Sequence, residues 1–163
     1  MAKRSRIKGK RIERDFVNRL KSLGIESARV PNSGNSPYSM FKGDVIVNIE
    51  GKIYVFELKG RKRLVSPFNN LKDIIQIDKY IAIPFNLLLE KNEEDIKKEI
   101  EKQKKRIVMP KTVQQWIDQS KRENAFLVIK ENYRDFIFII EKKDLSLILS
   151  IIKKKHNSGG ENN

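Results

Sequence analysis

Two carboxylates and a lysine on a predicted β-hairpin are the residues of this sequence best placed to do chemistry. Residues 44–59 are rich in β-branched and aromatic side chains, and a Glu-Gly pair at positions 50 and 51 has the length and the glycine of a two-residue turn. A turn at this pair places Asp44 directly opposite Glu57, with Cβ atoms about 4.5–5.5 Å apart. Lys59 follows Glu57 by two residues and therefore projects from the same face of the sheet.

Paired carboxylates of this kind favour a metal-ion site. Two apposed carboxylates repel each other unless positive charge neutralises them, and Lys59 supplies only one such charge. Oxygen ligands without histidine or cysteine favour a hard ion, so we expect Mg²⁺, with Mn²⁺ as a possible substitute. Such an ion can activate water and hold a phosphodiester, while Lys59 orients that water or stabilises charge on the phosphate. The pattern predicts metal-dependent phosphodiester hydrolysis, and the alternative is a solvent-exposed polar face whose acids are only structural.

Composition excludes several other kinds of chemistry and indicates the partner. The chain has 163 residues, no cysteine and one histidine, His156, which lies in a polar C-terminal stretch. Sites that use cysteine thiolates are therefore excluded, and sites that use histidine are nearly excluded. The formal net charge of +14 favours a polyanionic partner, most often nucleic acid, with a ribosomal or membrane-surface protein as the alternative. No apolar run has the length of a membrane span and the N-terminus lacks a signal core, so we expect a cytoplasmic protein.

The elements that must position the hairpin follow from apolar periodicity and from turn residues. In the N-terminal half, a basic arm over residues 1–11 leads into a helix that Gly24 ends, and a strand is expected over 25–30. In the C-terminal half, the expected elements are a strand at 80–83, an exposed charged helix at 90–106, a helix at 112–122 with a Thr112–Gln115 capping box, strands at 125–130 and 135–141, and a helix at 144–152. These elements predict an α/β fold with a mixed central sheet flanked by helices. We expect one domain over 1–152, an insertion at 66–109 and a disordered tail over 153–163.

The ordered set of motifs resembles the PD-(D/E)xK nuclease superfamily and, more narrowly, the archaeal-type Holliday junction resolvases. The matching features are Gly9-x-x-x-Glu13-Arg14 on the first helix, Gly24, a Ser/Gly-rich loop, Gly43-Asp44-Val45-Ile46, Phe56-Glu57-Leu58-Lys59 with a basic run after it, the Gln-Gln-Trp helix and the strand at 125–130. The resemblance covers roughly residues 6–64 and 110–141. Two features depart from the family pattern: Gly43 stands where the superfamily has proline, and the segment 66–109 is additional.

The resemblance implies a restriction-endonuclease-like core and a role for each matching residue. Glu13, Asp44 and Glu57 would be metal-site acids, and Lys59 would be the catalytic lysine. Ser33 would be the loop serine that assists cleavage, with Ser36 as the less favoured alternative. Gln114 or Gln115 could match the glutamine near the family's site. The family works as a homodimer that cuts opposite strands of a four-way DNA junction.

Basic residues outside the predicted active site are candidates for DNA contacts. These are Lys8, Lys10 and Arg11 at the N-terminus and Arg61, Lys62 and Arg63 after the second hairpin strand. Their contacts would be with phosphates and independent of sequence, so binding should weaken steeply with salt. Two alternatives to a junction resolvase stay open: a nuclease of the same superfamily acting on duplex or flap DNA, and a non-catalytic basic nucleic-acid-binding protein.

Overall fold

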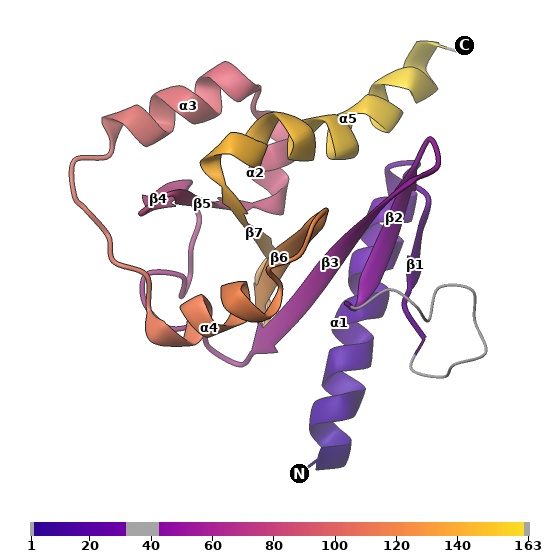
Figure 1. The fold of residues 1–163 in the computed structure, drawn as a ribbon, viewed down its shortest axis with the longest axis horizontal. Helices are drawn as coiled ribbons and strands as arrows, with labels where there is room; N and C mark the ends of the chain where they lie inside the picture. The colour runs from indigo at the N-terminus through magenta and orange to yellow at the C-terminus, as the bar shows by residue number, and fades with distance from the viewer. Residues whose placement is uncertain (1, 32–42, 162–163) are drawn as a thin grey trace.

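A computed structural model describes residues 2–31 and 43–161 (Figure 1). The helices are α1 (Ala2–Ser22), α2 (Phe85–Glu90), α3 (Glu93–Lys102), α4 (Lys111–Gln119), a short 3-10 turn η1 (Lys142–Asp144) and α5 (Leu145–Glu161). The strands are β1 (Ser27–Arg29), β2 (Val45–Ile49), β3 (Lys52–Arg61), β4 (Ile75–Ile77), β5 (Tyr80–Pro84), β6 (Ala125–Glu131) and β7 (Phe136–Glu141). In the described part of the chain no helix is long and apolar enough to cross a membrane.

The strands form one seven-stranded mixed sheet in the order β1-β2-β3-β6-β7-β5-β4. Strands β3 and β6 run parallel at its centre, and the other described neighbours are antiparallel. The predicted α/β fold with a mixed central sheet flanked by helices is therefore confirmed. The parallel pair needs a long crossover, and the chain between β3 and β6 supplies it.

Helices cover the two faces of the sheet unequally. The larger apolar core joins one sheet face to α1, α2, α3 and α5, and the smaller core joins the other face to α4 and the segment 64–71. Phe16 of α1 is fully buried in the larger core, where its ring makes edge or tilted contacts with Phe56, Phe85, Phe136 and Phe138. These aromatic contacts fix α1 across the sheet, so they also fix the position of Glu13, one turn earlier on the same helix.

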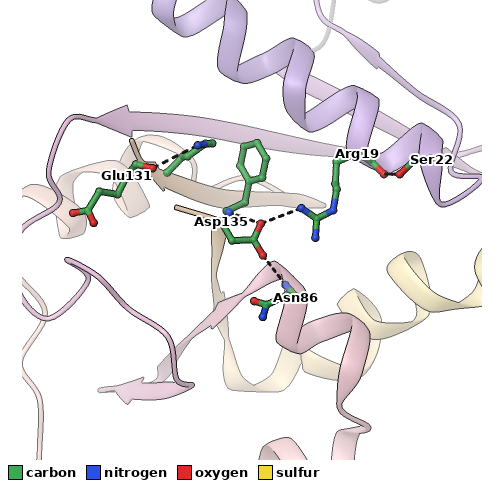
Figure 2. Close-up of polar contacts among 7 residues, drawn as sticks. Arg19, Ser22, Asn86, Glu131 and Asp135 are labelled. Carbon is green, nitrogen blue, oxygen red and sulfur yellow. Dashed lines mark hydrogen bonds and ion pairs between the residues drawn. The ribbon is translucent and has the colours of Figure 1, made fainter. Parts of the chain in front are cut away.

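Asp135 ties three elements together just before β7 (Figure 2). Its Oδ1 accepts from the Arg19 guanidinium at 3.2 Å and from the backbone N–H of Phe136 at 2.9 Å. Its Oδ2 accepts from the backbone N–H of Asn86, in the first turn of α2, at 2.8 Å. Arg19 also lies over the ring of Phe85, at 4.5 Å from the ring centroid. One carboxylate therefore links α1, α2 and β7.

Replacing Asp135 by alanine is expected to lower the free energy of unfolding by about 2–3 kcal/mol, because two backbone donors and a guanidinium lose their acceptor. Urea denaturation measures this change. Asp135→Asn, which keeps one acceptor oxygen, should lose less. If both variants unfold at the wild-type urea concentration, Asp135 does not hold these elements together.

Several predicted boundaries are wrong, each for a local reason. The first helix begins at Ala2, so the basic arm is itself helical, which agrees with the helix propensity of its Lys and Arg residues. Helix α4 begins at Lys111 with Pro110 at the N-cap position and no side-chain cap, so the Thr112–Gln115 capping box does not form. Helix α5 continues to Glu161, past the expected end at residue 152; the lysines at 153–155 favour this extension, whereas Gly159 and Gly160 do not. The disorder expected for the tail over 153–163 stays a prediction.

The additional segment 66–109 is part of the central sheet. Strand β5 pairs with β7, and β4 forms the edge beyond it. The charged helix predicted at 90–106 is shorter and not fully exposed: in α3, Ile96 and Ile100 are buried in the larger core. Asn92 caps this helix by accepting from the Asp95 N–H at 2.9 Å. The division into one domain and a tail, and any role of the segment in substrate choice, stay predictions.

Candidate active site

The hairpin has the predicted register. Val45 pairs with Phe56 and Ile49 with Lys52, so the turn falls at positions 50 and 51. Glu50 and Gly51 both have positive φ, 53° and 86°, as a type I′ turn requires. The Asn48 side chain accepts from the Gly51 N–H at 3.0 Å and closes the turn. The local sequence is therefore sufficient to place the two acids.

Asp44 lies one residue before β2, opposite Glu57 of β3. The backbone N–H of Asp44 donates to the Phe56 carbonyl at 3.1 Å, which continues the ladder by one step. The Asp44 Oδ2 accepts from the backbone N–H of Leu58 at 2.7 Å, so the carboxylate is held against β3. Lys59 lies on the same face of β3 as Glu57 and is half-buried.

Burial and mutual repulsion perturb both carboxylates. Burial raises the pKa of Asp44, and the neighbouring Glu13 raises it further, while the Leu58 N–H and Lys59 oppose the shift. Burial also raises the pKa of Glu57, the Asp44 carboxylate adds to the increase, and Arg122 and Lys59 act against it. Both acids are thus held where their negative charge is unfavourable, as in many catalytic sites.

Glu13 reaches this pair from α1. It lies within hydrogen-bonding reach of Asp44 and contributes to the raised pKa of that residue. The Arg29 Nε of β1 donates to the Glu13 Oε2 at 3.0 Å, and about a fifth of the Glu13 side chain is exposed. The structure therefore brings Glu13, Asp44, Glu57 and Lys59 to one place, as the sequence predicts, although their catalytic and metal-binding roles stay predictions.

Two arginines that the sequence analysis did not select join these acids. Besides Arg29, the Arg122 guanidinium donates to the Glu57 Oε2 at 3.1 Å. Arg29 could have been noticed as a charged residue in a short strand that precedes the site. Arg122 has no local signal, because it reaches Glu57 only through the parallel pairing of β3 with β6.

Gly43 allows the chain to approach β3 closely just before Asp44. Its φ is +133°, and a Cβ built there would lie 2.1 Å from Cγ1 of Val55 and within 4 Å of the Glu57 and Arg122 side chains. Proline fixes φ near −65° and cannot adopt this conformation. The substitution of glycine for the superfamily's proline therefore agrees with the local backbone.

Divalent-cation chemistry fits these residues in part. The donors are carboxylate oxygens, and a cation would offset the burial and the mutual repulsion that raise the pKa values of Asp44 and Glu57. Among the described residues, however, no three acidic or histidine side chains converge closely enough to hold an ion by themselves. Mg²⁺ usually takes one or two carboxylates and completes its shell with water and substrate phosphate. Asp44 and Glu57 satisfy that smaller requirement.

Three of the six predicted DNA-contact residues lie close together. Lys8 of α1 lies close to Arg61 and Lys62, whose charges, after burial itself, lower its pKa. Arg61 also lies over the ring of Trp116, which is buried in the smaller core, at 4.9 Å from its centroid. The remaining candidates are exposed: Lys10, Arg11 and Arg63.

Glu131 holds the basic segment that follows β3. Among the residues that the structure describes, it is the only charged residue that is buried, at 5% exposure, and it ends β6 directly beside Arg61. Its carboxylate accepts from the backbone N–H of Leu64 at 2.7 Å and of Asn70 at 3.0 Å. Glu131 therefore fixes the path of the chain that carries Arg61, Lys62 and Arg63, and nothing in the local sequence reveals this function.

Two other predicted site features, the loop serine and the glutamine at position 114 or 115, stay predictions. Ser33 and Ser36 lie outside the described residues. Gln114 donates to Asp118 on its own helix at 3.0 Å.

Comparison with known proteins agrees with the sequence resemblance. The sequence model of the family described as archaeal Holliday junction resolvase (Hjc) matches residues 4–68. A structural match is Hjc, a Holliday junction resolvase from the archaeal hyperthermophile Archaeoglobus fulgidus, with 17% sequence identity and a TM-score of 0.36 over 89% of this chain and 98% of that one. A search of curated proteins finds no significant match.

The protein thus combines a mixed α/β sheet with a carboxylate–lysine site on its central hairpin. The matched segment contains all four residues of that site, Glu13, Asp44, Glu57 and Lys59. The resemblance to the archaeal Holliday junction resolvases is confirmed for this segment.

Proposed function

We propose that this protein is a metal-dependent endonuclease that resolves four-way DNA junctions by paired phosphodiester hydrolysis. One observation carries the proposal: Glu13, Asp44, Glu57 and Lys59 lie together on three separate elements, within the segment that the resolvase family matches. A structural role explains a salt bridge on a sheet face, but it does not explain two apposed carboxylates, Asp44 and Glu57, placed where burial and repulsion oppose their charge.

Each residue has a distinct task in this proposal. Asp44 and Glu57 would hold Mg²⁺, for which Mn²⁺ can substitute. Glu13 would contact the ion through a bound water, or would act indirectly by contacting the Asp44 carboxylate. When bound, the ion would polarise the phosphate and activate the attacking water. Lys59, beside both acids, would orient that water or stabilise the negative charge that develops on the phosphate. Arg122 would compete with the ion for the Glu57 carboxylate, so the Arg122–Glu57 ion pair would have to loosen when the metal binds.

Metal binding is expected to stabilise the protein through Asp44. The raised pKa means that the folded state prefers protonated Asp44, so without metal the free energy of unfolding falls as pH rises from about 3.8 through the raised pKa. Asp44→Asn cannot ionise and can still accept from Leu58, so its Tm in EDTA at pH 7 should exceed that of wild type by a few degrees. Adding Mg²⁺ should raise the wild-type Tm and leave that of the variant nearly unchanged.

Differential scanning fluorimetry measures both effects, and Asp73→Asn, at an exposed acid between β3 and β4, is the matched control. The control should respond to Mg²⁺ as wild type does. An Asp44→Asn variant that still gains stability from Mg²⁺ would place the ion elsewhere.

The basic charge of the chain supports DNA as the substrate. A formal net charge of +14 favours sequence-independent phosphate contacts, so junction shape rather than base sequence would set the preference. Paired cuts require two active sites, and we therefore propose a homodimer. We expect it to act in the cytoplasm.

Competition between DNA substrates tests this choice of substrate. Purified protein is incubated in Mg²⁺ with a labelled four-way junction, a flap and a linear duplex of matched length. We expect the junction to be cut at least tenfold faster, and its binding to weaken by orders of magnitude between low and physiological salt. Equal or faster cutting of the flap or duplex would favour a different nuclease of the same superfamily. Tight binding with no cutting of any substrate would favour a non-catalytic DNA-binding protein.

A further inference from the structure

A basic hollow lies between α1 and the turn that joins β6 to β7, apart from the acidic site. Its volume is about 270 Å³, and its polar rim is formed by Lys8, Arg11, Asp15, Lys130, Asn132 and Tyr133. Ile12 forms its apolar part and lies against Gly60, near the end of β3, where even a Cβ would clash with its side chain. Gly60 pairs with Lys130 in the parallel register, so the hollow lies at the carboxyl ends of the two central strands.

Positive charge in this hollow exceeds negative charge. Three cations line it, Lys8, Arg11 and Lys130, against the single carboxylate of Asp15. Arg61 and Lys62 approach from the end of β3, close enough that they, with burial and Lys130, lower the pKa of Lys8. The Lys130 ammonium lies over the Phe136 ring, at 5.5 Å, and is 3.5 Å from the Glu131 carbonyl. Phosphate oxygens are the anions that a nucleic acid would bring to such a place.

Tyr133 at the rim presents an aromatic ring to solvent. Its side chain is fully exposed, so the ring buries nothing that would stabilise the fold. Its φ is +64°, a conformation that favours glycine or asparagine and disfavours large side chains. Backbone hydrogen bonds hold the turn on both sides: Asn132 N–H to the Arg61 carbonyl and Arg134 N–H to the Glu131 carbonyl, both at 3.1 Å. An aromatic ring kept in an unfavourable conformation and presented to solvent points to a binding role.

We propose that this hollow binds the backbone of an unpaired DNA strand, with a phosphate between Lys8, Arg11 and Lys130 and a base stacked on Tyr133. Aromatic rings beside a basic groove are the usual platform for unpaired bases, whose faces are free. In a duplex those faces are covered by neighbouring base pairs, so Tyr133 would distinguish unpaired from paired DNA. This inference goes beyond the proposed function, because it assigns a second site that binds single-stranded DNA without cutting it.

The position of the hollow suits such a strand. Glu57, Lys59 and Arg61 alternate along one face of β3, whereas Gly60 and the hollow lie on the α1 face. An unpaired strand that also reached Lys59 would pass Arg61 and turn around the end of β3 to reach Lys8 and Lys130. Arg61 and Lys62 follow Lys59 along the chain, and both lie near enough to Lys8 to lower its pKa.

The test measures binding in EDTA, where cleavage does not interfere. Fluorescence anisotropy is recorded with a labelled oligothymidine single strand and with a duplex of equal length. Tyr133→Asn, which removes the ring and suits the positive φ, should weaken single-strand binding about tenfold and leave duplex binding unchanged. Tyr133→Phe should bind both as wild type does. Lys130→Ala should weaken both and lower the slope of log affinity against log salt by about one, whereas Lys105→Ala, beside the distant edge strand β4, should change the slope less.

Three results would overturn the inference. The Tyr133→Asn variant could bind the single strand as tightly as wild type does, it could lose equal affinity for the duplex and the single strand, or sedimentation could show that the variant has a changed oligomeric state. Failure of the proposed function is distinguishable. If wild type cuts junctions but Tyr133→Asn binds normally, only this inference fails. If wild type cuts nothing while Tyr133→Asn loses single-strand binding, the subsite stands and the nuclease proposal fails.

Discussion

Replacing Lys59 by methionine is expected to lower the single-turnover rate of junction cleavage by about 10²- to 10³-fold. Methionine keeps most of the length and the apolar stem of the half-buried side chain and removes only the ammonium group. In the proposed site that group orients the water or stabilises charge on the phosphate as it is attacked. Binding of the junction in EDTA should fall by far less, because Lys59 is one of many cations on the chain.

The matched control for this prediction is Lys52→Met. Lys52 begins the same strand at the far end of the hairpin, where its ammonium lies over the Tyr54 ring, at 5.5 Å from the centroid. It should retain nearly full cleavage. If the Lys59 variant loses binding and cleavage in the same proportion, Lys59 contacts DNA but has no part in the chemical step.

Removing either central acid is expected to have a larger effect. Glu57→Gln and Asp44→Asn should each reduce cleavage by at least about 10³-fold, because each removes one of the two charged ligands proposed for the ion. Neither variant should unfold, since burial makes the charge of both residues unfavourable in the folded state. Initial rates on the four-way junction, measured across a Mg²⁺ titration, would record the loss.

Glu26→Gln is the control for the acid variants, because Glu26 is exposed just before β1. It should cleave as wild type does. If excess Mn²⁺ fully restores the Glu57→Gln variant, Glu57 contributes to metal affinity alone. A Glu57→Gln variant that is fully active without such rescue would exclude Glu57 from the site.

The sequence is most informative where the structure is local. The hairpin is set by two β-rich runs and a Glu-Gly turn, so the positions of Asp44, Glu57 and Lys59 relative to one another are predictable from residue numbers alone. The helical stripe of α1 is predictable in the same way, and it places Phe16 in the core. Only the family resemblance relates Glu13 to the hairpin acids.

The features that could not be predicted depend on contacts between distant segments. Arg122 reaches Glu57 because β6 pairs in parallel with β3, a pairing that no local pattern specifies. The local sequence gives Glu131 no feature that distinguishes it from an ordinary charged residue at a turn, although it is buried and accepts hydrogen bonds from the backbone N–H groups of Leu64 and Asn70. The segment 66–109 gives weak strand signals, because its strands are short and need β7 for a partner.

The central claim is that this protein cuts four-way junctions by using Asp44, Glu57 and Lys59 with a divalent ion. The most direct measurement maps the cleavage products of a junction labelled on each strand, in Mg²⁺ and in EDTA, for wild type and Glu57→Gln. We expect paired nicks on opposing strands in Mg²⁺, with none in EDTA and none from the variant. Equal cleavage in EDTA, or tight binding with no nicks under any condition, would contradict the account.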